Sequence, residues 1–329
     1  MNTLVIKEYR FLSVKFLRAY IITMRPYLMF VSGMTGILGM SFSSELSLIK
    51  SILIFTASFL SYGFGQALTD CFQTDTDTIS SPYRPLTRGI VKRNHFMLVS
   101  SFGLLLCVLI LTFYNPINLL LGVLAGMGLA TYTFFKRKWW AGPFYNSWIV
   151  VVLLMMAYLA GTESTQFNFS NLILITTIIV VFFGYANFVL AGYFKDIEAD
   201  RITLYKTMPV VFGRGASALV SDVFALIASA SLLITTMVLA FDSFSFRTIF
   251  KALVFTYGGI VTTVLAQIIL HSVQSDDEAH KAIVPCVHSY ILLLSGLTIL
   301  NKSDWFIPLL IFYILFIITL KLRPAKEQI

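Results

Sequence analysis

The chain has 329 residues, of which 57% are hydrophobic and only 12% are charged, and its formal net charge is +8. Soluble globular domains carry about 25% charged residues, so this composition excludes an ordinary soluble protein with one large core. The excess of Lys and Arg does not indicate nucleic-acid binding, because these residues flank long apolar segments instead of forming one patch.

The apolar segments predict ten transmembrane helices, because each is long enough to cross the ~30 Å hydrocarbon layer. In chain order they are expected near 20–42, 48–69, 96–113, 116–134, 143–161, 172–194, 216–240, 248–270, 282–300 and 306–322. Residues 1–19 would form an N-terminal segment and 323–329 a tail. No linker rich in Pro, Gly or Ser divides the chain, so 1–329 is predicted to be a single membrane-embedded domain, an all-α polytopic helical bundle.

The basic residues predict the orientation of these helices. With the N-terminus in the cytoplasm, the cytoplasmic side holds all of the 24 Lys and Arg residues except Lys50, Arg247, Lys251 and Lys302. The positive-inside rule therefore favours two cytoplasmic termini and an even number of spans. A nine-span alternative would place the basic tail on the outer side.

Two short acidic segments follow the second and the sixth predicted helix, both on the cytoplasmic side. Acidic residues are costly in membrane proteins, so this placement is informative. Asp196 and Asp200 are four residues apart and would project from one helix face. Asp70 and Asp77 are seven apart and would also share a face of a regular helix, with Asp75 pointing elsewhere.

Two facing carboxylate clusters repel each other unless cations lie between them. Mg²⁺ prefers oxygen ligands and completes its shell with water and substrate phosphates, so the pattern is typical of a site for a diphosphate and bridging Mg²⁺. The candidate ligands and catalytic groups are Asp70, Asp77, Asp196 and Asp200. Nearby cations are Arg25, Arg84, Arg88, Lys136, Lys195, Arg201 and Lys206, and all but Arg88 are expected to bind the diphosphate. A third acidic group, Asp276-Asp277-Glu278, has no partner motif and is interpreted as a solvated loop.

These residues resemble the UbiA superfamily of intramembrane prenyltransferases. Its first motif is Asn-x-x-x-Asp-x-x-x-Asp followed by Arg-Pro, and its second is Asp-x-x-x-Asp continuing into Thr-x-Pro-Val and a glycine. The matching parts of this chain are Arg25-Pro26, Asp77 with Tyr83-Arg84-Pro85-Leu86, and Asp196 to Asp200 with Thr207-Met208-Pro209-Val210 and Gly213. The resemblance covers roughly residues 20–300 and looks closest to the branch of chlorophyll synthase and geranylgeranylglyceryl phosphate prenyltransferase.

The first motif departs from the family pattern. Aligned without a gap from Pro82, the family's Asn falls on Thr69 and its first Asp on Gln73, which offers Mg²⁺ only a neutral carbonyl oxygen. A local shift would instead make Gln66 the amide and Asp70 the first Asp. Both registers remain open, and Gln73 joins the four aspartates as a candidate metal ligand.

The resemblance implies nine helices, here with a tenth, in a ring around a central chamber that the acidic loops cap. The expected activity is Mg²⁺-dependent transfer of a prenyl group from an allylic polyprenyl diphosphate to a lipophilic or aromatic acceptor, through an allylic carbocation. Aromatic chamber residues would stabilise this cation, but none is assigned individually. One alternative is a terpene cyclase that needs no acceptor, and another is a carrier or assembly protein without chemistry. Membrane lipid is the expected surrounding, and no nucleic-acid partner is expected.

Overall fold

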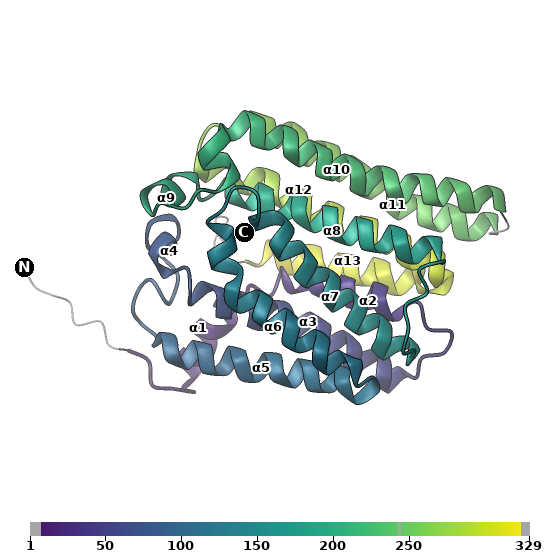
Figure 1. Cartoon of the computed structure of the whole chain (residues 1–329), viewed down its shortest axis with the longest axis horizontal. Helices are drawn as coiled ribbons and strands as arrows, with labels where there is room; N and C mark the ends of the chain where they lie inside the picture. Colours follow the sequence, from purple (N-terminus) through teal and green to yellow (C-terminus); the bar gives the residue numbers. More distant parts are fainter. Residues whose placement is uncertain (1–7, 243–244, 324–329) are drawn as a thin grey trace, which may run out of the picture.

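A computed structural model describes residues 8–242 and 245–323, and the helices of these residues lie side by side along one long axis (Figure 1). The expected N-terminal segment falls within them only from residue 8, and the expected tail only at Arg323. The α-helices are α1 (Val14–Met24), α2 (Met29–Met40), α3 (Leu48–Asp70), α4 (Thr74–Ser80), α5 (Arg93–Tyr114), α6 (Ile117–Lys136), α7 (Gly142–Thr162), α8 (Leu172–Tyr193), α9 (Ile197–Ile202), α10 (Met208–Asp242), α11 (Phe246–Ser272), α12 (His280–Asn301) and α13 (Phe306–Lys321). Two short 3₁₀ helices, η1 (Asp276–Glu278) and η2 (Ser303–Trp305), precede α12 and α13.

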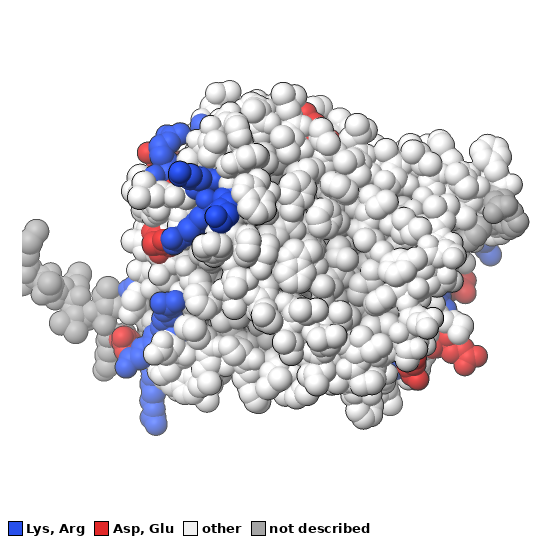
Figure 2. Space-filling view, in the orientation of Figure 1, with Lys and Arg blue, Asp and Glu red and all other residues white. Residues whose placement is uncertain are grey.

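The bundle has the dimensions and surface of an integral membrane protein. Among the described residues, nine helices are long and apolar enough to cross a membrane, and ten are if the bent pair α1 and α2 counts as one span. In the face shown in Figure 2, charged side chains lie mainly at the two ends and leave a broad, almost uncharged belt between them. Such a belt is what a hydrocarbon layer requires. The predicted all-α transmembrane bundle is therefore confirmed.

The first predicted span is not one helix. Its two parts, α1 and α2, meet at an angle of 64°. The break follows from Arg25-Pro26, because a residue before proline is disfavoured in the α region and Pro cannot donate a helical hydrogen bond. Arg25 accordingly takes a left-handed conformation with φ 52° and ψ 68°. The expectation of a continuous helix over 20–42 was wrong, and the bend turns Arg25 toward the end of α3.

The first acidic segment also differs from the expected regular helix. The α3 helix ends at Asp70 and a new helix, α4, begins at Thr74. Gln73 lies between them with φ −117° and ψ 22°, outside the helical region. Asp70 and Asp77 therefore do not share one helix face, and any convergence of their carboxylates depends on tertiary contacts.

Helix α12 forms the centre of the bundle. Its span is 89% buried, whereas the span of the last helix, α13, is only 17% buried. A helix that is apolar all round belongs in a core, and α12 is enclosed by α2, α8 and α11. The peripheral α13 packs through Phe312, whose ring centroid lies 5.0 Å from that of Phe30 on α2.

Candidate active site

The two acidic segments meet at one end of the bundle, where α4 and α9 lie beside each other (Figure 1). Three side chains at this end link them, the exposed Asp75 and Arg137 and the buried Tyr205. The Tyr205 hydroxyl donates to Asp75 at 3.2 Å, and Arg137 pairs with Asp75 at 3.2 Å. Asp75 is half exposed, so it points away from the other aspartates as expected. This linkage holds the segment after α3 against the segment after α8.

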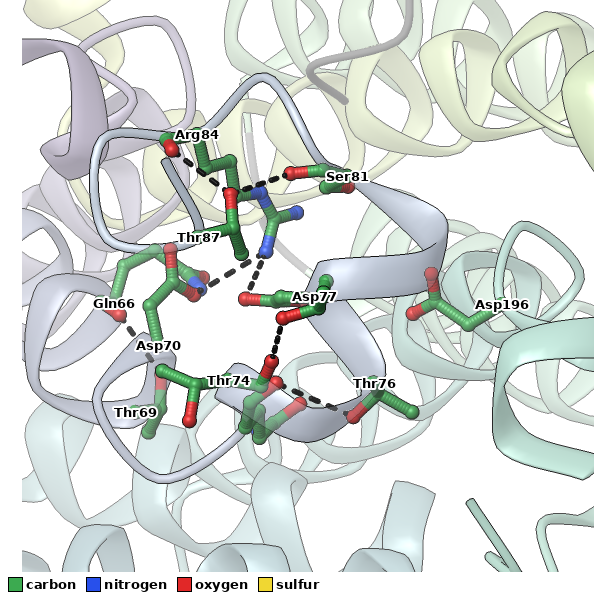
Figure 3. Close-up of polar contacts among 12 residues, drawn as sticks. Gln66, Thr69, Asp70, Thr74, Thr76, Asp77, Ser81, Arg84, Thr87 and Asp196 are labelled. Carbon is green, nitrogen blue, oxygen red and sulfur yellow. Dashed lines mark hydrogen bonds and ion pairs between the residues drawn. The ribbon is translucent and has the colours of Figure 1, made fainter. Parts of the chain in front are cut away.

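Two arginines hold the carboxylates of the first segment. The Asp70 carboxylate is 3.0 Å from Nη2 of Arg25 and 3.8 Å from Nη1 of Arg84, and Gln66 donates to it at 2.7 Å. Asp77 is 2.5 Å from the same Nη1 of Arg84. Figure 3 shows the Arg84 guanidinium between the two carboxylates. The bend at Arg25 and the return of the chain at Arg84 thus bring Asp70 and Asp77 together, which helical spacing alone does not do.

Burial sets the protonation of this first cluster. Asp70 and Asp77 are only 4% and 6% exposed. Burial raises the pKa of Asp77 to about 6, although the Arg84 guanidinium opposes this shift. For Arg84, burial works against the charged form, but Asp77 and Asp70 outweigh it and hold its pKa above the usual value. The guanidinium therefore stays charged while Asp77 titrates near neutral pH.

One lysine holds the carboxylates of the second segment. Nζ of Lys136, the last residue of α6, lies 3.7 Å from Asp196 and 3.6 Å from Asp200. The same ammonium donates to Oε1 of Gln73 at 3.1 Å, so it joins the two acidic segments. Thr207 donates to Oδ2 of Asp200 at 3.1 Å, while the buried Oδ1 has no hydrogen-bond partner.

The charges of the second cluster are unevenly compensated. Burial raises the pKa of Asp200, which is fully buried, to about 6. Burial acts on Asp196 in the same direction, but Lys136, Lys195 and Arg84 outweigh it and lower the pKa of this carboxyl. Lys195 donates to the Tyr83 hydroxyl at 3.4 Å, and burial together with Arg84 lowers its pKa to about 7. An anion bound beside it would favour its charged form.

A cavity of about 260 Å³ connects these charged groups to an apolar chamber between the helices. Of the residues predicted to form the site, the cavity wall includes Arg25, Asp70, Gln73, Asp77, Arg84, Lys136, Lys195 and Asp196. Asp200 lies behind this wall. Arg201 is exposed and pairs with Glu198 at 2.9 Å, and Lys206 is exposed as well. The structure therefore does not bring these two cations to the cavity.

Sequence reasoning did not identify the aromatic part of the wall. The cavity is also lined by Tyr62, Tyr132, Tyr185, Phe188 and Tyr193. The Tyr132 and Tyr193 hydroxyls lie 3.0 Å apart, and Nζ of Lys136 lies 5.5 Å from the Tyr193 ring centroid. No motif separates these rings from the many lipid-facing aromatics of the chain. Only their shared position, in roughly the last two turns of α3, α6 and α8 before the charged end, could have suggested them.

The oxygen donors of the site fit hydrated Mg²⁺. Within the described ranges, no three His, Cys, Asp or Glu side chains converge as a ligand group. The donors instead form two carboxylate pairs with the Gln73 amide between them, and one buried carboxylate oxygen of Asp200 has no hydrogen-bond partner. Mg²⁺ is commonly bound by one or two carboxylates, with water and substrate phosphates as further ligands. The donor set therefore fits Mg²⁺ ions that are also coordinated by a phosphate-bearing substrate. It does not fit a site in which protein groups supply every ligand.

The family profile and the similar proteins of known name both indicate one protein family. The profile of the UbiA prenyltransferase family matches residues 29–285. Digeranylgeranylglyceryl phosphate synthase from Thermococcus sibiricus is 27% identical over 63% of this chain and 73% of its own. The enzyme of that name from Thermococcus kodakarensis is 26% identical over 64% and 74%.

Solved structures share the fold. A UbiA homolog from Aeropyrum pernix K1 has a TM-score of 0.67 at 17% identity, with 82% of this chain and 96% of that chain covered. A UbiA homolog from Archaeoglobus fulgidus bound to GPP and Mg²⁺ has a TM-score of 0.64 at 16% identity, with 87% and 99% covered. The family profile spans well over half of this chain, so the resemblance seen in its motifs is confirmed. The chain belongs to the UbiA prenyltransferase family and is a multi-pass membrane enzyme of the prenyltransferase class.

Proposed function

We propose that this protein transfers a prenyl group from an allylic polyprenyl diphosphate to a lipophilic or aromatic acceptor, with Mg²⁺ as cofactor. The observation that carries the proposal is the single cavity. At one end it presents four cations and the acidic segments, and at the other end an apolar chamber with an aromatic wall. An allylic diphosphate has the same division between a charged head and an apolar chain.

The cations would bind the diphosphate head. Arg25, Arg84, Lys136 and Lys195 all line the cavity. Arginine matches phosphate oxygens with a planar fork, and lysine contributes a compact charge. Because these cations are paired with aspartates, bound diphosphate would compete with the carboxylates for them. The aspartates released in this way would be free for metal ions.

Mg²⁺ would be held by Asp70, Gln73, Asp77 and Asp196, which line the cavity, with Asp200 behind them as a further candidate ligand. When bound, it supplies positive charge that neutralises the leaving diphosphate. The carbon–oxygen bond then breaks with its electron pair on the diphosphate, and an allylic carbocation remains in the chamber. Tyr62, Tyr132 and Tyr193 would face this cation with their rings and exclude water from it. The acceptor would form the new bond and release its proton to the departing diphosphate.

The test is diphosphate release by the purified protein. We would incubate it in detergent or nanodiscs with Mg²⁺ and C10, C15 or C20 allylic diphosphates, with and without acceptor. The names of the relatives make geranylgeranylglyceryl phosphate the first acceptor to try, followed by extracted lipids. Release that requires acceptor supports transfer. Release without acceptor that yields a cyclic hydrocarbon or alcohol would favour cyclisation, and no release under any condition would contradict both.

We also propose that both termini and the acidic end face the cytoplasm. Lys and Arg gather at the end of the molecule that carries α4 and α9, whereas the opposite end shows mainly acidic groups on the visible face (Figure 2). Reporter fusions after residues 18 and 325 should both report a cytoplasmic location. A C-terminal reporter on the other side of the membrane would contradict the ten-span arrangement.

A further inference from the structure

The third acidic group of the sequence is not simply a solvated loop. Its first residue, Asp276, lies in η1 between α11 and α12, and its side chain is 22% exposed. Oδ2 of Asp276 accepts a hydrogen bond from the backbone N–H of Glu198 at 2.8 Å. Oδ1 accepts one from Nη2 of Arg214 at 2.5 Å. Both carboxylate oxygens thus bind groups that lie far away in the sequence.

The Glu198 amide belongs to the helix that carries the second acidic motif. Glu198 stands in the first turn of α9, two residues after Asp196 and two before Asp200. With only six residues, α9 is too short to be stable by itself, so contacts from outside must fix its position. A displacement of its first turn would move Asp196 out of the cavity wall.

Both ends of this segment are held by residues just before α10 or near its beginning. Its C-terminal side is held where the Tyr205 amide donates to the Asp200 carbonyl at 2.7 Å and Thr207 donates to the Asp200 carboxylate. Its N-terminal side is held by Asp276, which is itself fixed by Arg214. Arg214 follows Gly213, whose φ of 78° and ψ of 172° interrupt the α10 helix. These values favour glycine and set the direction of the next residue.

We propose that Asp276 is a positioning residue that fixes the first turn of α9, so that Asp196 faces the cavity with Asp200 behind it. The carboxylate does so by accepting the Glu198 amide while Arg214 holds it in place. The consequence for catalysis rests on the proposed function, whereas the link between η1 and α9 does not. The loop between α11 and α12 thereby becomes a third component of the acidic end.

The chain offers a matched control one residue away. Asp277 lies on the same 3₁₀ turn, is exposed, and its side chain makes no ion pair or hydrogen bond within the described part of the protein. Asp276→Ala and Asp277→Ala therefore remove the same charge from the same turn. Only the first removes an acceptor from α9. Asp276→Asn is the conservative variant, because its amide oxygen can still accept from Glu198.

The first measurement is hydrogen–deuterium exchange of the backbone amides over residues 197–200, which requires no activity. For Asp276→Ala we expect exchange to be faster by about fivefold or more, since the first turn of α9 opens locally. Asp277→Ala should match the wild type, and Asp276→Asn should keep most of the protection. Equal exchange in Asp276→Ala and Asp277→Ala would overturn the proposal.

The second measurement is the Mg²⁺ dependence of prenyl diphosphate consumption. For Asp276→Ala, the Mg²⁺ concentration at half-maximal rate should rise several-fold while kcat at saturating Mg²⁺ falls less, since the ligands remain but are poorly positioned. An unchanged Mg²⁺ dependence together with faster exchange would overturn the positioning role. A wild-type protein that consumes no allylic diphosphate would contradict the proposed function instead, and exchange would still decide whether Asp276 holds α9.

Discussion

Each of the two acidic segments contributes a pair of aspartates to the candidate active site, but the two pairs are compensated differently. In the first segment, Asp70 and Asp77 share Arg84, and Asp70 also pairs with Arg25. Two guanidinium groups thus serve two carboxylates. The planar fork of arginine suits carboxylates and keeps its charge at any physiological pH, so this cluster is close to neutral.

In the second segment two carboxylates share one ammonium group, that of Lys136. Lys195 lies close enough to lower the pKa of Asp196, but its own pKa is lowered to about 7 by burial and by Arg84. Oδ1 of Asp200 has no hydrogen-bond partner, and its nearest cation is the Lys136 ammonium at 3.6 Å. Above about pH 7, where Lys195 loses its charge, the second cluster therefore retains more negative charge than the first.

This difference suggests a division of labour. A cation is attracted most strongly where carboxylates are least compensated, so the second segment should contribute most to Mg²⁺ binding. The first segment, with its two arginines, should contribute more to binding and orienting the diphosphate. The four predictions below test this division, beginning with the largest expected effect.

The largest effect is expected from the second segment. Asp196→Asn and Asp200→Asn should each lower kcat/KM by at least about 100-fold, or ~2.7 kcal/mol on the barrier, because each removes a charged oxygen from the metal site without changing side-chain size. Glu198→Gln is the matched control on the same helix, since this exposed residue pairs with Arg201 outside the cavity. Kinetics at several Mg²⁺ concentrations provide the measurement. A variant with more than about a tenth of wild-type activity would show that the metal site is misassigned.

A smaller loss, about 30-fold in kcat/KM, is expected for Arg84→Met, which leaves two buried carboxylates without their shared partner. The pKa of Asp77, already about 6, should rise further without the guanidinium. The acidic limb of the pH profile should therefore move to higher pH. The exposed Arg88→Met is the control, and wild-type affinity for diphosphate in Arg84→Met would disprove the role of the first segment.

The first motif should tolerate a change at Gln73 better than at either aspartate. Asp70→Asn and Asp77→Asn should each cost about tenfold in rate, because each removes a negative charge paired with arginine. Gln73→Ala removes one hydrogen bond accepted from Lys136 but no charge, so it should cost about threefold or less. Gln73→Asp should lower the Mg²⁺ concentration needed for half-maximal rate, since it adds a carboxylate between the segments. The opposite ranking, with Gln73→Ala inactive and Asp70→Asn like the wild type, would favour the gapless register.

The smallest effect concerns pH. Below pH 6, protonation of Asp77 and Asp200 removes the negative charge that binds metal, so kcat/KM should fall. Above pH 7, free enzyme loses the positive charge of Lys195, so kcat/KM should fall again by a few-fold, roughly. Bound diphosphate keeps Lys195 charged, and kcat should lack this basic limb. Lys195→Arg should abolish the basic limb in kcat/KM, and a limb that persists would exclude Lys195 as its cause.

The acidic site could be predicted from the sequence because charged residues are rare in this chain. Each aspartate in an apolar context stands out, and the positive-inside pattern places both segments at the same end. This reasoning and the Arg-Pro motifs are enough to predict six of the residues that line the cavity. They are Arg25, Asp70, Asp77, Arg84, Lys136 and Asp196. Arg201 was grouped with them by proximity in sequence, but the turn of α9 directs it to solvent.

Hydropathy and length determined the membrane bundle by themselves, because a hydrocarbon layer admits few backbone structures other than long apolar helices. Only the tertiary structure decided which acid meets which base. The break at Arg25-Pro26, the return of the chain at Arg84 and the contact between Asp276 and α9 create pairs that regular helical spacing does not predict. The aromatic wall was equally undetermined, because a ring facing the chamber and a ring facing lipid are both simply apolar in sequence. Packing alone distinguishes them, since it depends on the relative rotation of neighbouring helices.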